Sequence, residues 1–116
     1  MSKFKVYVTD QRQPSFEIER RILSECDAEL ILCNCVTPED ISRKCADADA
    51  VLLDMAPMTA EAIHSMRKCQ VISRYGVGVD NVDLKAAAEC GIQVTNVPDY
   101  CMEDVSDHAL GLLFAC

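Results

Sequence analysis

The predicted fold rests on one stretch, Val71-Ile72-Ser73-Arg74-Tyr75-Gly76-Val77-Gly78-Val79-Asp80-Asn81-Val82-Asp83-Leu84. A short apolar run gives way to a Gly-x-Gly turn, and a helix signal begins at Asp83, so the order is strand, loop, helix. Glycines open backbone conformations that other residues avoid, and they let a ligand approach main-chain N–H groups directly. We therefore expect a small anion to bind at this turn.

Strand and helix signals alternate along the rest of the chain. Apolar runs typical of strands lie at residues 4–10, 29–33, 50–53, 70–73 and 92–95. Helix signals lie at residues 15–26, 37–41, 59–63, 83–90 and 102–116. Because strict alternation with short connections requires a parallel sheet, the sequence predicts an open, doubly wound α/β fold of about five strands.

The loops that follow the strands carry the candidate functional residues. Ligands bind open α/β sheets beyond the C-terminal ends of the strands. We therefore expect loops 10–13, 54–57, 74–80 and 96–101 to share one functional edge.

Composition limits the class of protein and its partners. The chain has 116 residues, which suits a single domain with one core. Its net charge of −8 is unfavourable for binding nucleic acid or anionic membrane surfaces. No apolar run approaches the ~20 residues that a membrane-spanning helix needs.

Eight cysteines occur without a Cys-x-x-Cys pair or a matching histidine spacing. The charged start Met1-Ser2-Lys3 does not resemble a secretion signal, so a disulfide framework is not expected. We expect buried free thiols in a reducing cytoplasm, and no metal site.

The Gly76-Val77-Gly78 turn is not a dinucleotide-binding fingerprint. The third glycine of Gly-x-Gly-x-x-Gly would fall at position 81, which is Asn81, and the helix does not start until Asp83. A tight loop alone explains a bare Gly-x-Gly. What favours binding is its position at the C-terminal end of a strand in an open sheet.

Three spaced motifs resemble the substrate-side domain of the D-isomer-specific 2-hydroxyacid dehydrogenases, especially the phosphoglycerate-dehydrogenase-like and C-terminal-binding-protein-like members. The resemblance covers almost the whole chain. The motifs are Ser73-Arg74-Tyr75-Gly76-Val77-Gly78-Val79-Asp80-Asn81-Val82-Asp83, Cys90-Gly91-Ile92-Gln93-Val94, and Asn96-Val97-Pro98 with Glu103-Asp104-Val105-Ser106-Asp107-His108-Ala109-Leu110.

The resemblance implies a two-domain oxidoreductase of which this chain holds one part. Residues 1–101 would form a flavodoxin-like substrate-binding domain, and residues 102–116 an interdomain helix leading to an absent Rossmann domain. The complete protein would be a cytoplasmic homodimer that transfers hydride between C2 of a 2-hydroxy or 2-keto acid and NAD, with NADP as the alternative cofactor. Because the family's catalytic side chains would lie beyond residue 116, no catalytic residue is nominated here, and the chain alone is expected to be inactive.

The resemblance also assigns binding residues. The backbone at Val77 and Gly78, beside Gly76, would face the substrate carboxylate, and the side of Val77 would face the nicotinamide. Arg74 is a candidate for binding a substrate anion, although an arginine beside a strand is more often solvated or paired within the protein. Val105 resembles a position that contacts the cofactor, but an ordinary apolar helix contact explains it at least as well.

Asp54 departs from the pattern that the resemblance suggests. A carboxylate in the loop after the third strand would repel a substrate acid. One alternative is therefore a free-standing flavodoxin-like binding module or receiver-type module with Asp54 as phosphoacceptor. Against the receiver, only Asp10 stands where an acidic pair is expected, and no lysine follows the fifth strand.

A second alternative is a corepressor-like scaffold that binds partner proteins. In such a protein the last helix would matter most, because an exposed apolar stripe can drive dimerisation. The apolar stripe of the last helix consists of Val105, Ala109, Leu112, Leu113 and Cys116.

Overall fold

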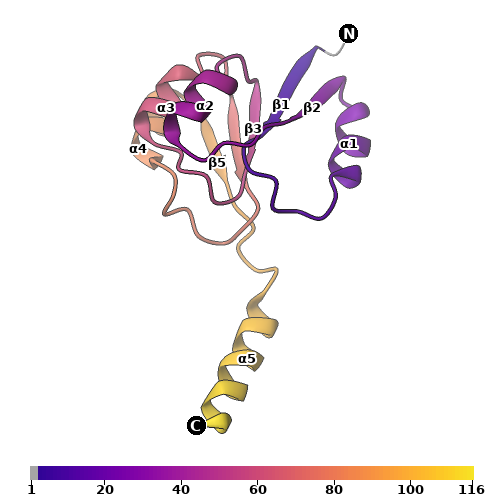
Figure 1. Ribbon diagram of the computed structural model, residues 1–116, viewed down its shortest axis with the longest axis vertical. Coiled ribbons are helices and arrows are strands. Elements are labelled where there is room, and N and C mark those ends of the chain that lie inside the picture. Colours follow the sequence, from indigo (N-terminus) through magenta and orange to yellow (C-terminus); the bar gives the residue numbers. More distant parts are fainter. Residues whose placement is uncertain (1–2) are drawn as a thin grey trace.

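The computed structural model describes residues 3–116, in which strands and helices alternate (Figure 1). The strands are β1 (Phe4–Val8), β2 (Ala28–Leu32), β3 (Ala50–Leu53), β4 (Val71–Arg74) and β5 (Gln93–Thr95). The helices are α1 (Glu17–Ser24), α2 (Pro38–Lys44), α3 (Ala60–Ser65), α4 (Leu84–Glu89) and α5 (Met102–Ala115). Each predicted element is present, with ends displaced by a few residues.

The strands form one parallel sheet in the order β2-β1-β3-β4-β5. Val6 of β1 pairs with Ala50 of β3, and Val51 of β3 pairs with Ile72 of β4, so the register continues across the centre of the sheet. The strand order reverses at β1, and right-handed crossovers then send helices to both faces. This confirms the predicted five-stranded, doubly wound, flavodoxin-like sheet.

Helices α2, α3 and α4 cover one face of the sheet (Figure 1). Each begins at a side chain that accepts a backbone N–H from the first turn: Thr37, Thr59 and Asp83. Beneath these helices Val51 and Ile72 are fully buried. Burying such a side chain stabilises the fold by about 1.5–3 kcal/mol.

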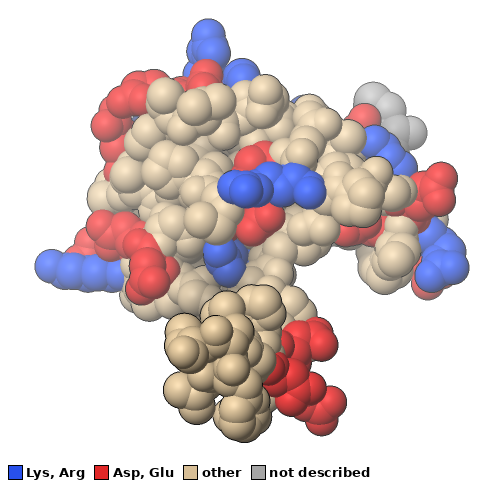
Figure 2. Space-filling model, turned by 60° about the horizontal axis from the view of Figure 1, so that its bottom comes forward, with Lys and Arg blue, Asp and Glu red and all other residues tan. Residues whose placement is uncertain are grey.

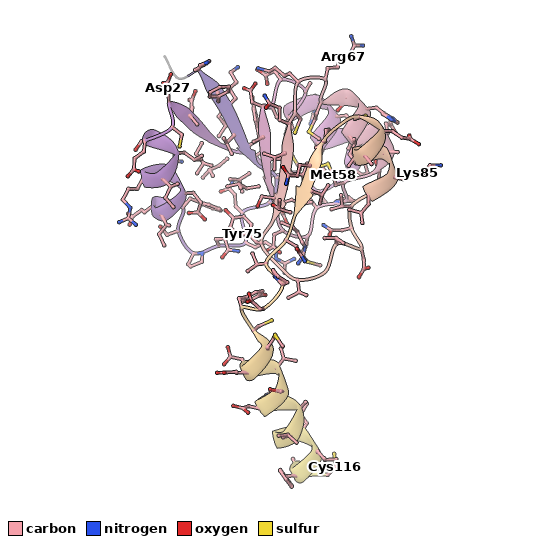
Figure 3. All side chains as sticks on the ribbon, turned by 180° about the vertical axis from the view of Figure 1, so that it is seen from behind. Asp27, Met58, Arg67, Tyr75, Lys85 and Cys116 are labelled. Carbon is pink, nitrogen blue, oxygen red and sulfur yellow. The ribbon has the colours of Figure 1, made fainter. Side chains whose placement is uncertain are left out.

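Among residues 3–116, the one helix on the other face of the sheet is α1, which lies beside β2 (Figure 1). Val8, Phe16 and Leu30 form a smaller core under this helix. The hydroxyl of Tyr75 donates a hydrogen bond to the carboxylate of Glu19 on α1 at 2.9 Å. Figure 3 shows Tyr75 between α1 and the ends of the strands. Within residues 3–116, no helix covers the part of this face that β3, β4 and β5 form.

Helix α5 leaves the sheet as a projecting arm (Figure 1). None of its residues is buried, and apolar side chains such as Leu113 and Phe114 are 69% and 84% exposed. Neither α5 nor any other helix in residues 3–116 is long and apolar enough to cross a membrane. The predicted helix is therefore present, and its apolar residues have no partner in this part of the chain.

The cysteines are free thiols, as predicted, but they are not all buried. Cys35, Cys45 and Cys69 lie in the core between the sheet and its helices. Cys26 and Cys90 are exposed because they lie just beyond the ends of α1 and α4. Burial raises the pKa of the Cys69 thiol to about 11.

This contrast predicts the order in which the thiols react. At about pH 8, iodoacetamide should modify Cys26 and Cys90 quickly and Cys69 much more slowly, because the thiolate is the nucleophile and a raised pKa keeps Cys69 protonated. Peptide mass spectrometry over time measures each rate.

The same pKa shift makes the stability of the fold depend on pH. The pKa of Cys69 is higher in the folded chain than in the unfolded chain, so the contribution of this thiol to stability is present below the unfolded pKa. This contribution is lost as pH rises towards 11.

Urea-unfolded chain provides the control, because all sites should then react at similar rates. Native Cys69 reacting as fast as native Cys90 would contradict the packing described here.

Candidate functional site

The predicted functional edge is organised by the carboxylate of Asp10, which lies two residues after β1. It accepts the backbone N–H groups of Asp54, Met55 and Ala56 at 3.0, 2.6 and 3.2 Å. Hydrogen bonds to an ionised carboxylate are stronger than neutral ones. They hold the loop after β3 against the loop after β1, which confirms that residues 10–13 and 54–57 meet at one edge.

Arg74, at the end of β4, joins the next loop to the same edge. Its Nε donates to the carbonyl of Asp54 at 3.1 Å, and its Nη2 lies 3.2 Å from Sδ of Met55. Nδ2 of Asn81 donates to the Asp54 carbonyl and to that of Ala56, at 3.1 and 2.9 Å. The Arg74 side chain is only 13% exposed. Arg74, which we predicted to bind an anion, thus holds the loop after β3 in place.

The glycines of the turn do not have the unusual backbone conformations that we expected of them. Neither Gly76 nor Gly78 has a positive φ, so the expectation of unusual backbone conformations is wrong for both. At Gly76 the space beside the backbone is taken by Arg74, because a Cβ there would lie 1.6 Å from its Nη1 and the guanidinium would have to move. At Gly78 the nearest atom to such a Cβ would be an oxygen of Asp80 at 3.7 Å, an ordinary contact.

Several backbone donors of this turn make no hydrogen bond within residues 3–116. They are the N–H groups of Gly76, Val77, Gly78, Val79, Asp80 and Asn81, of which those of Val77 and Gly78 belong to two consecutive exposed residues. The turn itself is fixed, because the Gly76 carbonyl accepts the N–H of Val97 at 3.0 Å and the Val77 carbonyl accepts Nδ2 of Asn96 at 2.8 Å. Val77 is 43% exposed. Consecutive donors on a fixed, accessible turn suit a carboxylate.

Asp54 places one negative charge between two arginines. Its carboxylate oxygens lie 3.9 Å from Nη2 of Arg74 and 4.0 Å from Nε of Arg12. The distances are long and Arg12 is exposed, so each ion pair is weak. Asp54 nevertheless acts as a counterion here, which reduces the repulsion that an isolated carboxylate would exert on a substrate acid.

A pocket of about 370 Å³ lies beside the segment that follows the glycine turn. It surrounds the backbone bridge between Met58 and Val82. Its carboxylates make it unsuited to an anion, and that of Asp83 already accepts the N–H of Ala86 as a helix cap. The lining residues are Pro57, Met58, Thr59, Asp80, Asn81, Val82 and Asp83.

The structure does not bring all the predicted binding residues together. Arg74, Gly76, Val77 and Gly78 are neighbours on one turn, but Val105 is 61% exposed on the projecting helix α5 (Figure 1). Among residues 3–116, no cluster of three His, Cys, Asp or Glu side chains is suited to a metal ion.

Sequence reasoning missed three residues that shape the edge. Asp10 was considered only as part of the loop 10–13 and as the single acid at the place of a receiver's acidic pair, and Asn81 only as a motif residue that breaks a glycine fingerprint. Asn96 was noticed within a motif without a role. The available signal was position: each lies just beyond a strand or in the turn after one, and such side chains meet at one edge of a parallel sheet.

Substitution of the two glycines should separate their roles. Gly76→Ala should lower the free energy of unfolding by about 1 kcal/mol, because the new Cβ displaces Arg74 and breaks its bond to the Asp54 carbonyl. Gly78→Ala should change it by less than about 0.5 kcal/mol. Urea unfolding of both variants measures the difference. Equal stabilities would show that the guanidinium does not rest on Gly76.

Comparison with known proteins shows that almost the whole chain is similar to one enzyme family. Residues 6–111 match the model for "D-isomer specific 2-hydroxyacid dehydrogenase, catalytic domain". The chain is 38% identical over 112 residues to D-3-phosphoglycerate dehydrogenase of Methanocaldococcus jannaschii, covering 96% of this chain and 21% of that protein.

Two solved structures have folds similar to that of this chain. TT0316 protein from Thermus thermophilus has a TM-score of 0.82 and 30% identity, over 97% of this chain and 36% of that one. NAD+-bound 3-phosphoglycerate dehydrogenase of Entamoeba histolytica has a TM-score of 0.80 and 27% identity, over 95% of this chain and 38% of that one. The chain therefore spans well under half the length of these relatives. Since the family model covers nearly all of its sequence, the chain belongs to the D-isomer specific 2-hydroxyacid dehydrogenase family.

Proposed function

We propose that residues 1–101 are the substrate-binding domain of an NAD-dependent oxidoreductase that acts on the CH–OH group of 2-hydroxy acids. Residues 102–116 would be the interdomain helix that leads to an NAD-binding domain. The observation that carries this proposal is the pair of unused N–H groups at Val77 and Gly78, on a turn that is fixed and accessible. In a family defined by 2-hydroxy acids, a carboxylate is the ligand that such a pair fits.

The chain's own residues bind and orient rather than transfer protons. The turn holds the carboxylate end of the acid. This positions C2 for hydride transfer, whose catalytic groups would lie outside residues 3–116. The bound nicotinamide supplies hydride chemistry. The side of Val77 would contact the nicotinamide end, and Val105 would contact cofactor only when α5 is packed against a second domain.

Residues 3–116 fit only a small part of NAD or NADP. Their glycine turn has Asn81 where a pyrophosphate loop needs its third glycine, and α4 begins only at Leu84. The pyrophosphate and ribose would therefore be held mainly by residues outside this part of the chain. We expect the 116-residue chain to be inactive by itself.

The charges of the arginines at the edge, Arg12 and Arg74, are matched by the carboxylates of Asp10 and Asp54, so no net charge there repels a small acid. Arg74 is already bonded to the Asp54 loop, and Asp54 offsets its charge and that of Arg12. In this role Arg74 would contribute to substrate binding chiefly by keeping the turn in place, and only secondarily by direct contact. We further expect a cytoplasmic homodimer of the longer protein, without nucleic acid or membrane partners, in keeping with its net charge of −8.

Amide chemical shifts test the proposed carboxylate site directly. Titrating the 116-residue chain with pyruvate should progressively shift the N–H signals of Val77 and Gly78. Pyruvamide, which lacks the carboxylate charge, should shift them far less. The N–H of Gly91 serves as internal control, because it is already bonded to the Ala88 carbonyl at 3.1 Å.

Calorimetric titration with NADH tests whether the cofactor is bound mainly by residues outside this part of the chain. The chain should show no tight binding, since it lacks a pyrophosphate loop. Tight NADH binding would contradict this division, and pyruvate shifts confined to other parts of the chain would contradict the carboxylate site.

A further inference from the structure

Three of the eight cysteines lie between the sheet and helix α2. Two of them, Cys33 and Cys35, follow β2, and their N–H groups donate to the carbonyls of Val8 and Thr9, both at 2.8 Å. These bonds continue the pairing with β1 beyond the last residue of β2. Residues two apart in an extended segment point to the same side. Both cysteine side chains therefore face the core under α2, where Cys35 is buried and Cys33 is partly buried.

Helix α2 brings a third thiol to the same place. Cys45 ends this helix about one turn after Ile41, and both side chains are fully buried, so this side of α2 faces the sheet. The ammonium of Lys44 donates to the carbonyl of Asn34, which lies between the other two cysteines in the chain. The end of α2 is thus attached to the segment that carries them.

The three thiols are close enough to act on one another. The thiol of Cys45 is within hydrogen-bonding reach of those of Cys33 and Cys35. Burial raises the pKa of all three thiols, whereas the hydrogen bond from Cys45 and the positive charge of Lys44 oppose this rise at Cys33. Since the thiolate is the reactive form, an oxidant reacts first at a thiol that it can reach and whose thiolate a positive charge favours. Cys33 meets both conditions, because it is the most accessible of the three.

The other five cysteines lie apart from this group. Cys26 and Cys90 are exposed just beyond the ends of α1 and α4. Cys69 is buried, but the groups that shift its pKa include no second thiol. Cys101 and Cys116 lie at the two ends of α5, and Figure 2 shows this helix standing out from the body of the molecule. The grouping of thiols is therefore specific to α2 and the segment after β2 within residues 3–116.

Oxidation can join two sulfurs of such a group, and geometry decides which two. Cα atoms two residues apart in an extended segment are separated by about 6.6 Å, which is near the upper end of the distance that a disulfide spans. A bond between Cys33 and Cys35 would therefore be strained. Cys45 approaches Cys33 from the facing helix and is free of this restriction. In reducing compartments, disulfides that do form are usually transient and respond to oxidants.

We propose that Cys33 and Cys45 form a reversible disulfide when the protein meets a hydroperoxide. First, the sulfur of Cys33 attacks one peroxide oxygen: an S–O bond forms, the O–O bond breaks, and the other oxygen leaves as water or an alcohol with the proton of the thiol. Next, the sulfur of Cys45 attacks that of Cys33: an S–S bond forms, the S–O bond breaks, and water leaves with the proton of Cys45. The two sulfurs lose two electrons, which the peroxide takes up. This chemistry needs no substrate acid and is independent of the proposed function.

Peptide mapping after treatment with hydrogen peroxide tests the disulfide. The reduced 116-residue chain is treated at low protein concentration, blocked with N-ethylmaleimide in denaturant and digested with trypsin. Mass spectrometry should find a linked pair of peptides from one chain, joined between Cys33 and Cys45, and dithiothreitol should separate them. Fragment ions that divide Cys33 from Cys35 assign the bond. Cys69 is the internal control, because this buried thiol should stay unoxidised and be recovered with the blocking group.

Two serine substitutions on the same side of one segment form a matched pair. Cys33→Ser should abolish the link to Cys45, whereas Cys35→Ser should keep it. An unchanged amide spectrum shows that each variant folds, and the map of the unmodified chain does not depend on either variant. Loss of the link in Cys35→Ser, or its persistence in Cys33→Ser, would overturn the proposal. Oxidation of Cys33 without a link, or links formed only between two molecules, would also overturn it.

Discussion

The carboxylate of Asp10 is the constraint on which the edge of this sheet depends. Three backbone N–H groups from the loop after β3 converge on it. Without that carboxylate, these donors would need other partners at a partly buried position, and unpaired donors there are costly. The fixed loop then offers its Asp54 carbonyl to Arg74 and Asn81. The loops after three strands are thus joined through three side chains, those of Asp10, Arg74 and Asn81.

This arrangement explains why the N–H groups of the glycine turn stay unpaired within residues 3–116. Arg74 reaches the Asp54 carbonyl with its guanidinium against Gly76, in the space that a Cβ there would take. The carbonyls of Gly76 and Val77 are used to hold the segment after β5, whereas the N–H groups of Val77 and Gly78 are not used. The turn is therefore held by its acceptors, and its unpaired donors are what the proposed carboxylate site requires.

Much of the fold could be predicted because its signals are local. Thr37, Thr59 and Asp83 mark helix starts by accepting N–H groups within three residues, and buried strands show as short apolar runs. The position of the glycine turn was also predictable. The roles of Asp10 and Arg74 were not, because their partners lie 44 to 46 and 19 to 20 residues away. A single sequence does not record which charged side chain meets which loop.

By itself, the sequence determined the order of strands and helices, the parallel sheet and the family, since periodicity, caps and motifs are properties of neighbouring residues. Only the tertiary structure decided that the Arg74 guanidinium lies against Gly76, that this glycine has no positive φ, and that Asp54 lies between two arginines. It also decided that the residues of α5 are exposed. These facts depend on distances between segments remote in sequence, which packing alone sets.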